Sequence, residues 1–144
     1  MDQEEKKMRN IHNFSTKLQQ QSVIDQLRQY IEWQRKSISI DHDKPLTMLA
    51  PKFGPVSINL DLTTACNHRR PFCVDMDMLN SGNKLCTNET KRMIDLLCDK
   101  GLKSVIVIGG GEPTIHKDFE EIIVYLKSKG LQLGIVTNGT KMDK

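Results

Sequence analysis

The sequence predicts an α/β fold built on a parallel sheet, and two observations carry that prediction. Three short apolar runs alternate with two amphipathic stretches along residues 55–144, which is the strand and helix order of βαβ units. A glycine follows each amphipathic stretch, at Gly101 and Gly130, where helices commonly end. With 144 residues, of which 38% are hydrophobic, the chain is long enough for one domain with an apolar core.

Residues 1–54 are predicted to form a helical extension and a linker ahead of the main domain, residues 55–144. Apolar residues recur at helical spacing over residues 15–35, and Ser15 is the predicted N-cap. The expected apolar face consists of Leu18, Ile24, Leu27 and Ile31, and the expected solvent face of Gln19, Gln20, Gln26 and Gln29. Residues 41–55 hold three of the five prolines and are predicted to be extended. A helix packed beside the main domain is the simpler interpretation, and a partner-binding helix is the alternative.

Three segments are predicted to be strands. Residues 56–62 alternate apolar and polar residues, residues 105–108 form a continuous apolar run typical of a buried parallel strand, and residues 131–136 form the third. No helix follows the third strand, so an apolar face and an edge are expected to be uncovered. We expect the chain to be the front part of a longer domain, and self-association through the open edge is the alternative.

Two segments of the main domain are predicted to be helices. The first covers residues 87–100, with Thr87 as N-cap, and its apolar side consists of Met93, Ile94, Leu97 and Cys98. The second covers residues 118–129, and its apolar stripe consists of Phe119, Ile122, Ile123 and Leu126.

Two cysteines lie in the polar loop that follows the first predicted strand. Cys66 and Cys73 are separated by Asn, His, Arg, Arg, Pro and Phe. Parallel α/β folds bind their ligands at the carboxyl ends of strands, where this loop begins. In a reducing compartment, paired thiols more often serve metal or redox chemistry than disulfides. Two unligated thiols in a surface loop are the alternative.

A glycine-rich turn, residues 109–113, follows the second predicted strand. Its three glycines would let a ligand approach the backbone closely, and a tight connection between strand and helix is the alternative. The turn is not a dinucleotide fingerprint, because Thr114 stands where the third glycine is required. It also lacks the Gly-Lys-Ser/Thr of a P-loop, so a plain nucleotide-binding domain is the weakest hypothesis.

Taken together, residues 55–140 resemble the radical S-adenosylmethionine (SAM) superfamily. That family carries a Cys-x-x-x-Cys-x-x-Cys motif, usually with an aromatic residue before the last cysteine, and a Gly-Gly-Glu-Pro motif after the next strand. The first motif is matched by Cys66, Phe72 and Cys73. The second motif is matched by Gly110, Gly111, Glu112 and Pro113.

The resemblance implies that the chain is the front portion, about three β/α units, of a partial (β/α)6 barrel preceded by the helical segment. In the family, three cysteines hold a [4Fe–4S] cluster, and SAM binds the iron that they leave open. An electron from the cluster, which an external donor reduces, cleaves SAM to methionine and a 5′-deoxyadenosyl radical, and this radical takes hydrogen from a substrate. By resemblance, Cys66 and Cys73 would bind the cluster, residues 110–113 would belong to the SAM site, and Phe72 would lie near the adenine.

The sequence departs from the family pattern at the middle cysteine, where Arg70 stands. A guanidinium has only donors and stays protonated, so it cannot bind iron. His68, Cys86 or another chain could supply a third ligand, although an unligated Cys86 is the simpler interpretation. Two explanations fit both Arg70 and the short length: a truncated or defective copy of an active enzyme, or a natural relic without radical chemistry.

Two rival functions follow from this departure. One is a non-catalytic binding or regulatory relic of the fold, and the other is a zinc module in which His68 completes a site with the two cysteines. Neither a membrane span nor a secretory signal is recognisable, and a net charge of +3 does not indicate nucleic-acid binding. The expected location is therefore the cytoplasm. The isolated histidines, His12, His42 and His116, are predicted to lie at the surface.

Overall fold

The computed structural model describes residues 20–38 and 51–142. The chain divides into two units, Met1–Phe53 and Gly54–Lys144. In the first unit the described element is helix α3, Gln21–Ile38. The predicted N-cap Ser15 and most of the predicted connection lie outside the described residues.

The predicted apolar face of this first helix is partly wrong. Gln26 is buried, with only 8% of its surface exposed, whereas Ile31 is 46% exposed. A glutamine can be buried when its polar groups have partners, and Gln26 does not lack an interaction partner. The apolar pattern cannot register this, because it counts every glutamine as facing solvent.

The second unit is an α/β unit with a parallel sheet, as predicted. Its elements are β1 (Ser57–Leu60), α5 (Thr87–Asp99), β2 (Ser104–Val107), the 3-10 helix η1 (Pro113–Ile115), α6 (Phe119–Ser128) and β3 (Gln132–Ile135). The strand order is β1-β2-β3, and both neighbouring pairs are parallel. In register, Ile58 lies beside Val105, which lies beside Leu133.

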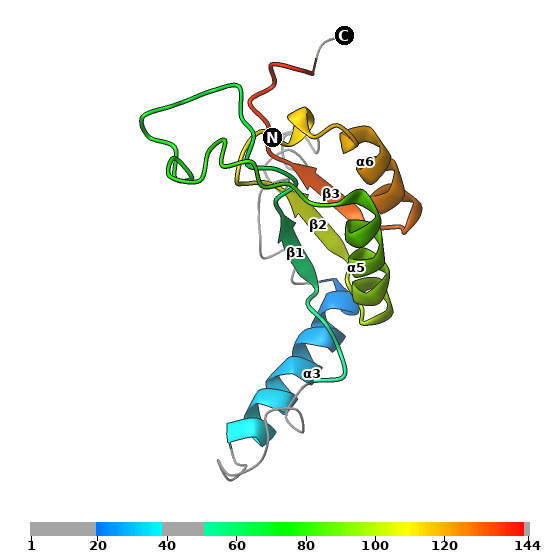
Figure 1. The fold of residues 1–144 in the computed structure, drawn as a ribbon. Coiled ribbons are helices and arrows are strands. Elements are labelled where there is room, and N and C mark those ends of the chain that lie inside the picture. Colours follow the sequence, from blue (N-terminus) through cyan, green and yellow to red (C-terminus); the bar gives the residue numbers. More distant parts are fainter. Residues whose placement is uncertain (1–19, 39–50, 143–144) are drawn as a thin grey trace, which may run out of the picture. The chain divides into compact units, whose positions relative to one another are not determined.

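One face of this sheet carries the core. Helices α5 and α6 lie on the same side of the sheet (Figure 1). Their buried residues Ile94, Ile122 and Leu126 join one apolar cluster with sheet residues that include Val105 and Val107. Burial of these side chains is the main force that holds the helices to the sheet.

The opposite face of the sheet is less apolar than predicted. Alternation places on it Ser57, Asn59, Ser104, Ile106, Gln132 and Gly134. Only Ile106 is a large apolar residue, so this is a mostly polar or small-residue face. The helices already cover the apolar side.

None of the described helices is both long enough and apolar enough to cross a lipid bilayer.

Helices α5 and α6 are each followed closely by a glycine, and the residue at the start of α5 contacts the start of α6. Gly101 and Gly130 have φ of 99° and 72°, the left-handed backbone that suits a residue without a Cβ, so both predicted stops are confirmed. The predicted N-cap Thr87 is wrong, because Cys86 occupies that position. The Thr87 hydroxyl instead donates to the Asp118 carboxylate at 2.5 Å.

Candidate functional site

The carboxyl ends of the three strands open into one cleft of about 350 Å³. Each strand is followed by a loop that contributes to the cleft wall, as expected for a parallel α/β sheet. The lining residues are Cys66, His68, Arg70, Phe72, Cys73, Val74, Asp75, Ile108, Gly109, Gly111, Glu112, Val136, Thr137 and Asn138. Five of the seven residues predicted from the sequence therefore lie together in this cleft.

The cysteine loop presents its two thiols at the cleft. Cys66 and Cys73 are both free and partly exposed. The backbone N–H of His68 donates to the Cys66 sulfur at 3.4 Å, and the Cys66 N–H donates to the Asn80 side chain at 2.9 Å. The Cys73 N–H donates to the carbonyl of Arg70 at 3.1 Å, which forms a tight turn. The loop thus positions Cys66, Arg70 and Cys73 along the same cleft.

These residues do not make a complete cluster site. A [4Fe–4S] cluster of the family type needs three thiolates, and Arg70 offers the cleft a guanidinium without a lone pair. Among residues 20–38 and 51–142, no three His, Cys, Asp or Glu side chains gather as metal ligands. The donor set therefore fits neither the three-thiolate cluster nor a zinc site completed by His68.

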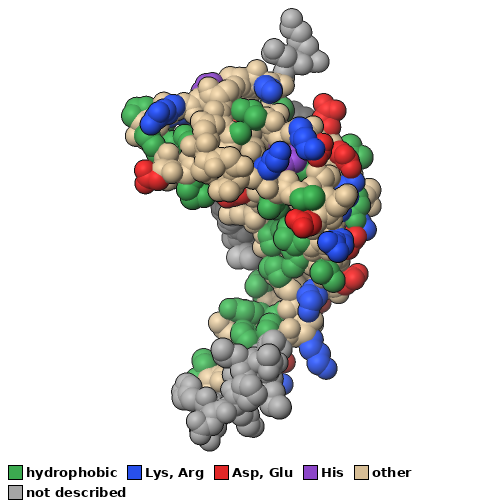
Figure 2. Space-filling model, in the orientation of Figure 1, with side chains coloured by type: hydrophobic (Ala, Val, Ile, Leu, Met, Phe, Trp, Pro, Cys, Tyr) green, Lys and Arg blue, Asp and Glu red, His purple; other side chains and the backbone are tan. Residues whose placement is uncertain are grey.

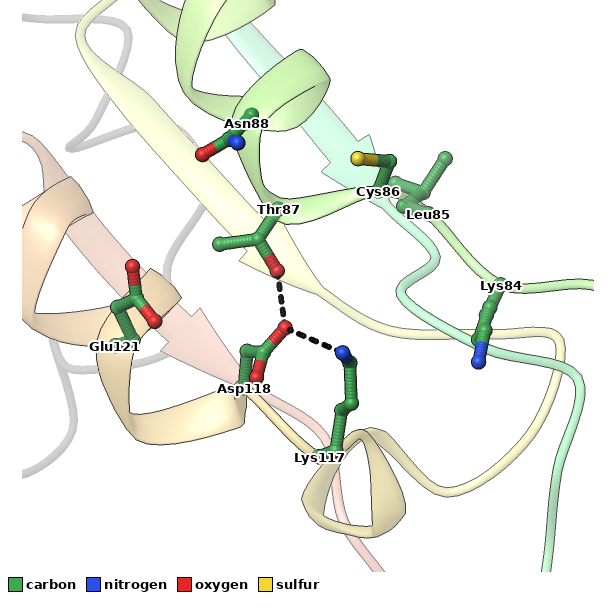
Figure 3. Close-up of a pocket in the computed structure, with 8 residues that line it drawn as sticks. All are labelled: Lys84, Leu85, Cys86, Thr87, Asn88, Lys117, Asp118 and Glu121. Carbon is green, nitrogen blue, oxygen red and sulfur yellow. Dashed lines mark hydrogen bonds and ion pairs between the residues drawn. The ribbon is translucent and has the colours of Figure 1, made fainter.

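Cys86 lies at a different pocket. This second pocket, of about 370 Å³, is bordered by the start of α5 and by Lys117, Asp118 and Glu121 (Figure 3). Cys86 is exposed there, at the N-cap of α5. Of the two alternative ligands considered from the sequence, only His68 lines the cleft with Cys66 and Cys73.

The three glycines let the turn after β2 pass directly against the loop after β1. A Cβ on Gly111 would overlap the Ala65 carbonyl oxygen and lie 2.6 Å from the carbonyl carbon of Thr64. The following N–H, of Glu112, donates to that same Ala65 oxygen at 2.8 Å. Packing between loops is thus one reason for the glycines, in addition to any ligand.

The Gly-Gly-Glu-Pro residues have different surroundings. Gly111 and Glu112 line the cleft, whereas buried Gly110 borders another pocket with Asp61 and Thr63. Pro113 is fully buried and begins η1. Gly110 and Pro113 therefore shape the turn without lining the cleft.

The Glu112 carboxylate joins the second loop to the third. It is only 3% exposed and accepts hydrogen bonds from the Thr137 hydroxyl at 2.6 Å and the Asn138 N–H at 2.7 Å. The Thr114 hydroxyl and N–H donate to it at 2.7 and 3.2 Å. Burial raises the pKa of Glu112, but these hydrogen bonds outweigh burial and leave the pKa below its ordinary value of 4.5.

A second set of hydrogen bonds joins the third loop to the cysteine loop. The Asn138 side chain donates to the Asn67 oxygen at 2.8 Å, and the Asn67 amide donates to the Thr140 hydroxyl at 2.6 Å. Asn138 also accepts from the Thr140 hydroxyl at 2.7 Å. The positions of Asn67, Asn138 and Thr140 in the sequence do not predict these hydrogen bonds, because the two loops meet only when the sheet has formed.

The cysteine loop also exposes apolar side chains. Phe72 is 77% exposed and Val74 is 97% exposed, and both line the cleft. Figure 2 shows hydrophobic, basic and acidic side chains together over this loop, at the upper left. The cleft therefore combines an open aromatic surface with polar groups.

Two acidic residues, Asp61 and Asp75, follow β1 in the chain. Loss of solvent around the Asp61 carboxylate and, secondarily, the charge of Asp75 raise the pKa of Asp61. The Asp61 side chain also occupies the space that a Cβ on Gly109 would need. Asp75 itself lines the cleft, so the cleft contains a carboxylate as well as Arg70.

His116, predicted to lie at the surface, is buried. Its Nε2 lies 3.0 Å from the Leu85 carbonyl, and its Nδ1 accepts from the Asp118 N–H at 3.2 Å. The imidazole joins the start of α6 to the loop before α5, a structural role that an isolated histidine in a sequence does not reveal. His12 and His42 lie outside the described residues.

Comparison with known proteins gives one family. The sequence profile of the Radical SAM superfamily matches residues 60–144. The chain is 36% identical over 85 residues to an S-adenosylmethionine-dependent nucleotide dehydratase of Selenomonas ruminantium, covering 59% of this chain and 30% of that protein. It is 37% identical over 110 residues to the mitochondrial GTP 3′,8-cyclase of Arabidopsis thaliana, covering 71% and 28%.

A PqqA peptide cyclase of Bradyrhizobium diazoefficiens is 30% identical over 97 residues, covering 66% of this chain and 25% of that protein. The chain thus spans less than a third of the length of these three relatives. No solved structure matches the chain significantly.

Proposed function

The chain belongs to the radical SAM superfamily, and from this premise we propose that its cleft is the SAM site of a radical SAM core whose cluster site is incomplete. A complete site of this kind serves reductive cleavage of SAM, with an external electron donor and a separate substrate. SAM would bind in the cleft, and the thiolate that the cluster site lacks is the one that a cysteine at position 70 would supply.

The convergence of the motif residues in one cleft supports this proposal. Cys66, Phe72 and Cys73 come from the loop after β1, and Gly111 and Glu112 come from the turn after β2. A cleft of about 350 Å³ is within the range of small-molecule sites, about 300–1,000 Å³. Its exposed aromatic ring can stack on the base of a nucleoside, and the polar groups of its loops can form hydrogen bonds with an amino-acid group.

Arg70 explains why the cleft is incomplete. Its position in the sequence, between Cys66 and Cys73, is that of the middle cysteine of the family motif, and its side chain lines the cleft. Replacing a thiolate by a guanidinium removes a ligand and adds a positive charge. We therefore propose that the chain holds the SAM pocket but not the three-thiolate cluster, and that Arg70→Cys restores the ligand set.

A SAM-cleavage assay tests the proposed function. The chain, Arg70→Cys and Arg70→Ser are treated anaerobically with iron and sulfide, reduced, and incubated with SAM. Formation of methionine and 5′-deoxyadenosine is expected only for Arg70→Cys. Serine is the matched control because it removes the arginine without supplying a thiolate. Failure of an iron-loaded Arg70→Cys protein to form these products would contradict the proposal, as would equal product formation by the unchanged chain.

A further inference from the structure

Arg70 places a positive charge in the cleft. It forms no ion pair with any residue in the described part of the chain, although its side chain lines the cleft. We propose that Arg70 binds the carboxylate of a ligand that joins a nucleoside to an amino acid, so that the cleft holds such a ligand without any metal cluster. This inference rests on the proposed function, which assigns SAM to the same cleft.

The charges of the cleft match the amino-acid end of such a ligand. Asp75 lines the cleft and, like Arg70, forms no ion pair with a described residue. Glu112 is not available, because Thr114, Thr137 and Asn138 already donate to its carboxylate. The cleft therefore offers one guanidinium and one carboxylate, which are complementary to the carboxylate and ammonium of a zwitterionic amino acid. Arginine is suited to the first contact because its planar fork binds a carboxylate in two places.

The nucleoside end has apolar surfaces to contact. The Phe72 ring is 77% exposed and lines the same cleft as Ile108 and Val136. An exposed aromatic ring provides a stacking surface for a base, and the two aliphatic side chains add apolar surface to the cleft. Arg70 and Phe72 stand two positions apart in the cysteine loop and line the same cleft, so one ligand bound there would contact both.

Two ligands separate the contribution of Arg70 from that of the nucleoside surface. S-adenosylhomocysteine keeps the amino-acid end and cannot be cleaved by reduction of a sulfonium, whereas 5′-methylthioadenosine lacks the amino-acid end. Calorimetry is performed on the full chain, purified with a chelator and free of iron. The unchanged chain is expected to bind S-adenosylhomocysteine about tenfold or more tightly than 5′-methylthioadenosine, the effect of one hydrogen-bonded charge.

Matched variants identify the residue responsible. Arg70→Ala is expected to weaken S-adenosylhomocysteine about tenfold and to leave 5′-methylthioadenosine unchanged. Arg69→Ala removes a neighbouring exposed arginine that does not line the cleft, and it is expected to change neither affinity. Equal unfolding midpoints for the two variants and the unchanged chain establish that the comparison concerns folded protein.

The outcomes distinguish this inference from the proposed function. Equal affinity of the unchanged chain for the two ligands, no binding of either, or an unaltered affinity in Arg70→Ala would overturn the inference. SAM cleavage by iron-loaded Arg70→Cys, which contains no arginine at this position, is measured separately. An active Arg70→Cys protein beside any of these results would overturn the inference and leave the proposed function standing. Conversely, an arginine-dependent affinity together with an inactive iron-loaded variant would overturn the proposed function alone.

Discussion

The backbone N–H of Asn138 donates to the Glu112 carboxylate at 2.7 Å, and this contact ties the loop after β3 to the turn after β2. The Thr137 hydroxyl adds a second bond to the same carboxylate. From there the Asn138 side chain donates to Asn67, the residue after Cys66. One connected set of hydrogen bonds thus spans the three loops that form the cleft.

Removing the charge of Glu112 is expected to destabilise the domain. Glu112→Gln keeps the size of the side chain, but its amide nitrogen cannot accept from the threonine hydroxyls or the Asn138 N–H. The expected loss is about 1–3 kcal/mol of unfolding free energy, measured by urea titration. Glu120→Gln, on the exposed side of the first turn of α6, is the control and is expected to stay within about 0.5 kcal/mol. A loss no larger than that of the control would show that the carboxylate does not hold the loops.

The same carboxylate predicts a pH dependence of stability. Because hydrogen bonds leave the folded-state pKa of Glu112 below its ordinary value of 4.5, the ionised group stabilises the fold above pH 4.5. That contribution is lost as the pH falls below 4.5 through the lowered pKa. The difference in unfolding free energy between the unchanged chain and Glu112→Gln should therefore shrink on acidification. A difference that stays constant from neutral pH down to about pH 3 would contradict this origin.

Gly111 is expected to tolerate no side chain. The Cβ of Gly111→Ala would meet backbone atoms of Thr64 and Ala65, which cannot move aside as a flexible side chain can. We expect a loss of about 1–3 kcal/mol in unfolding free energy. Gly134→Ala is the matched control, since its Cβ would lie 3.6 Å from Ile106, an ordinary contact, and it should change stability by less than about 1 kcal/mol. Equal effects at both positions would mean that the close approach of the two loops is unimportant.

Cys66 and Cys86 should behave differently once a third thiolate is present. In the Arg70→Cys background, Cys66→Ser is expected to abolish the visible absorption of a reconstituted iron–sulfur cluster. Cys86→Ser is expected to leave it unchanged, because Cys86 borders a separate pocket at the start of α5. Loss of the absorption in the Cys86 variant would place that thiol in the cluster site.

Much of the fold could be predicted from local patterns. The three strands, the two helices of the main domain and the stops at Gly101 and Gly130 follow from apolar periodicity and from glycine. The grouping of Cys66 with Glu112 follows from parallel strands, whose carboxyl ends meet at one edge of a sheet. These features need no knowledge of specific tertiary contacts.

The remaining features depend on contacts between residues distant in the sequence. Thr87 donates to Asp118, and buried His116 contacts the Leu85 carbonyl, each across 31 positions. The resemblance implied that residues 110–113 belong to the SAM site, but it did not indicate that the Glu112 side chain accepts hydrogen bonds from the loop after β3. A pattern along one strand or helix cannot specify such partners, because they are set by how the elements pack.

Iron and sulfide bound per chain after anaerobic reconstitution test whether Arg70 is what leaves the cluster site incomplete. We expect about four iron and four sulfide per chain for Arg70→Cys, the content of one [4Fe–4S] cluster, and far less for the unchanged chain and Arg70→Ser. Equal and full loading of the unchanged chain would contradict this expectation, because another ligand would then complete the site with Arg70 in place.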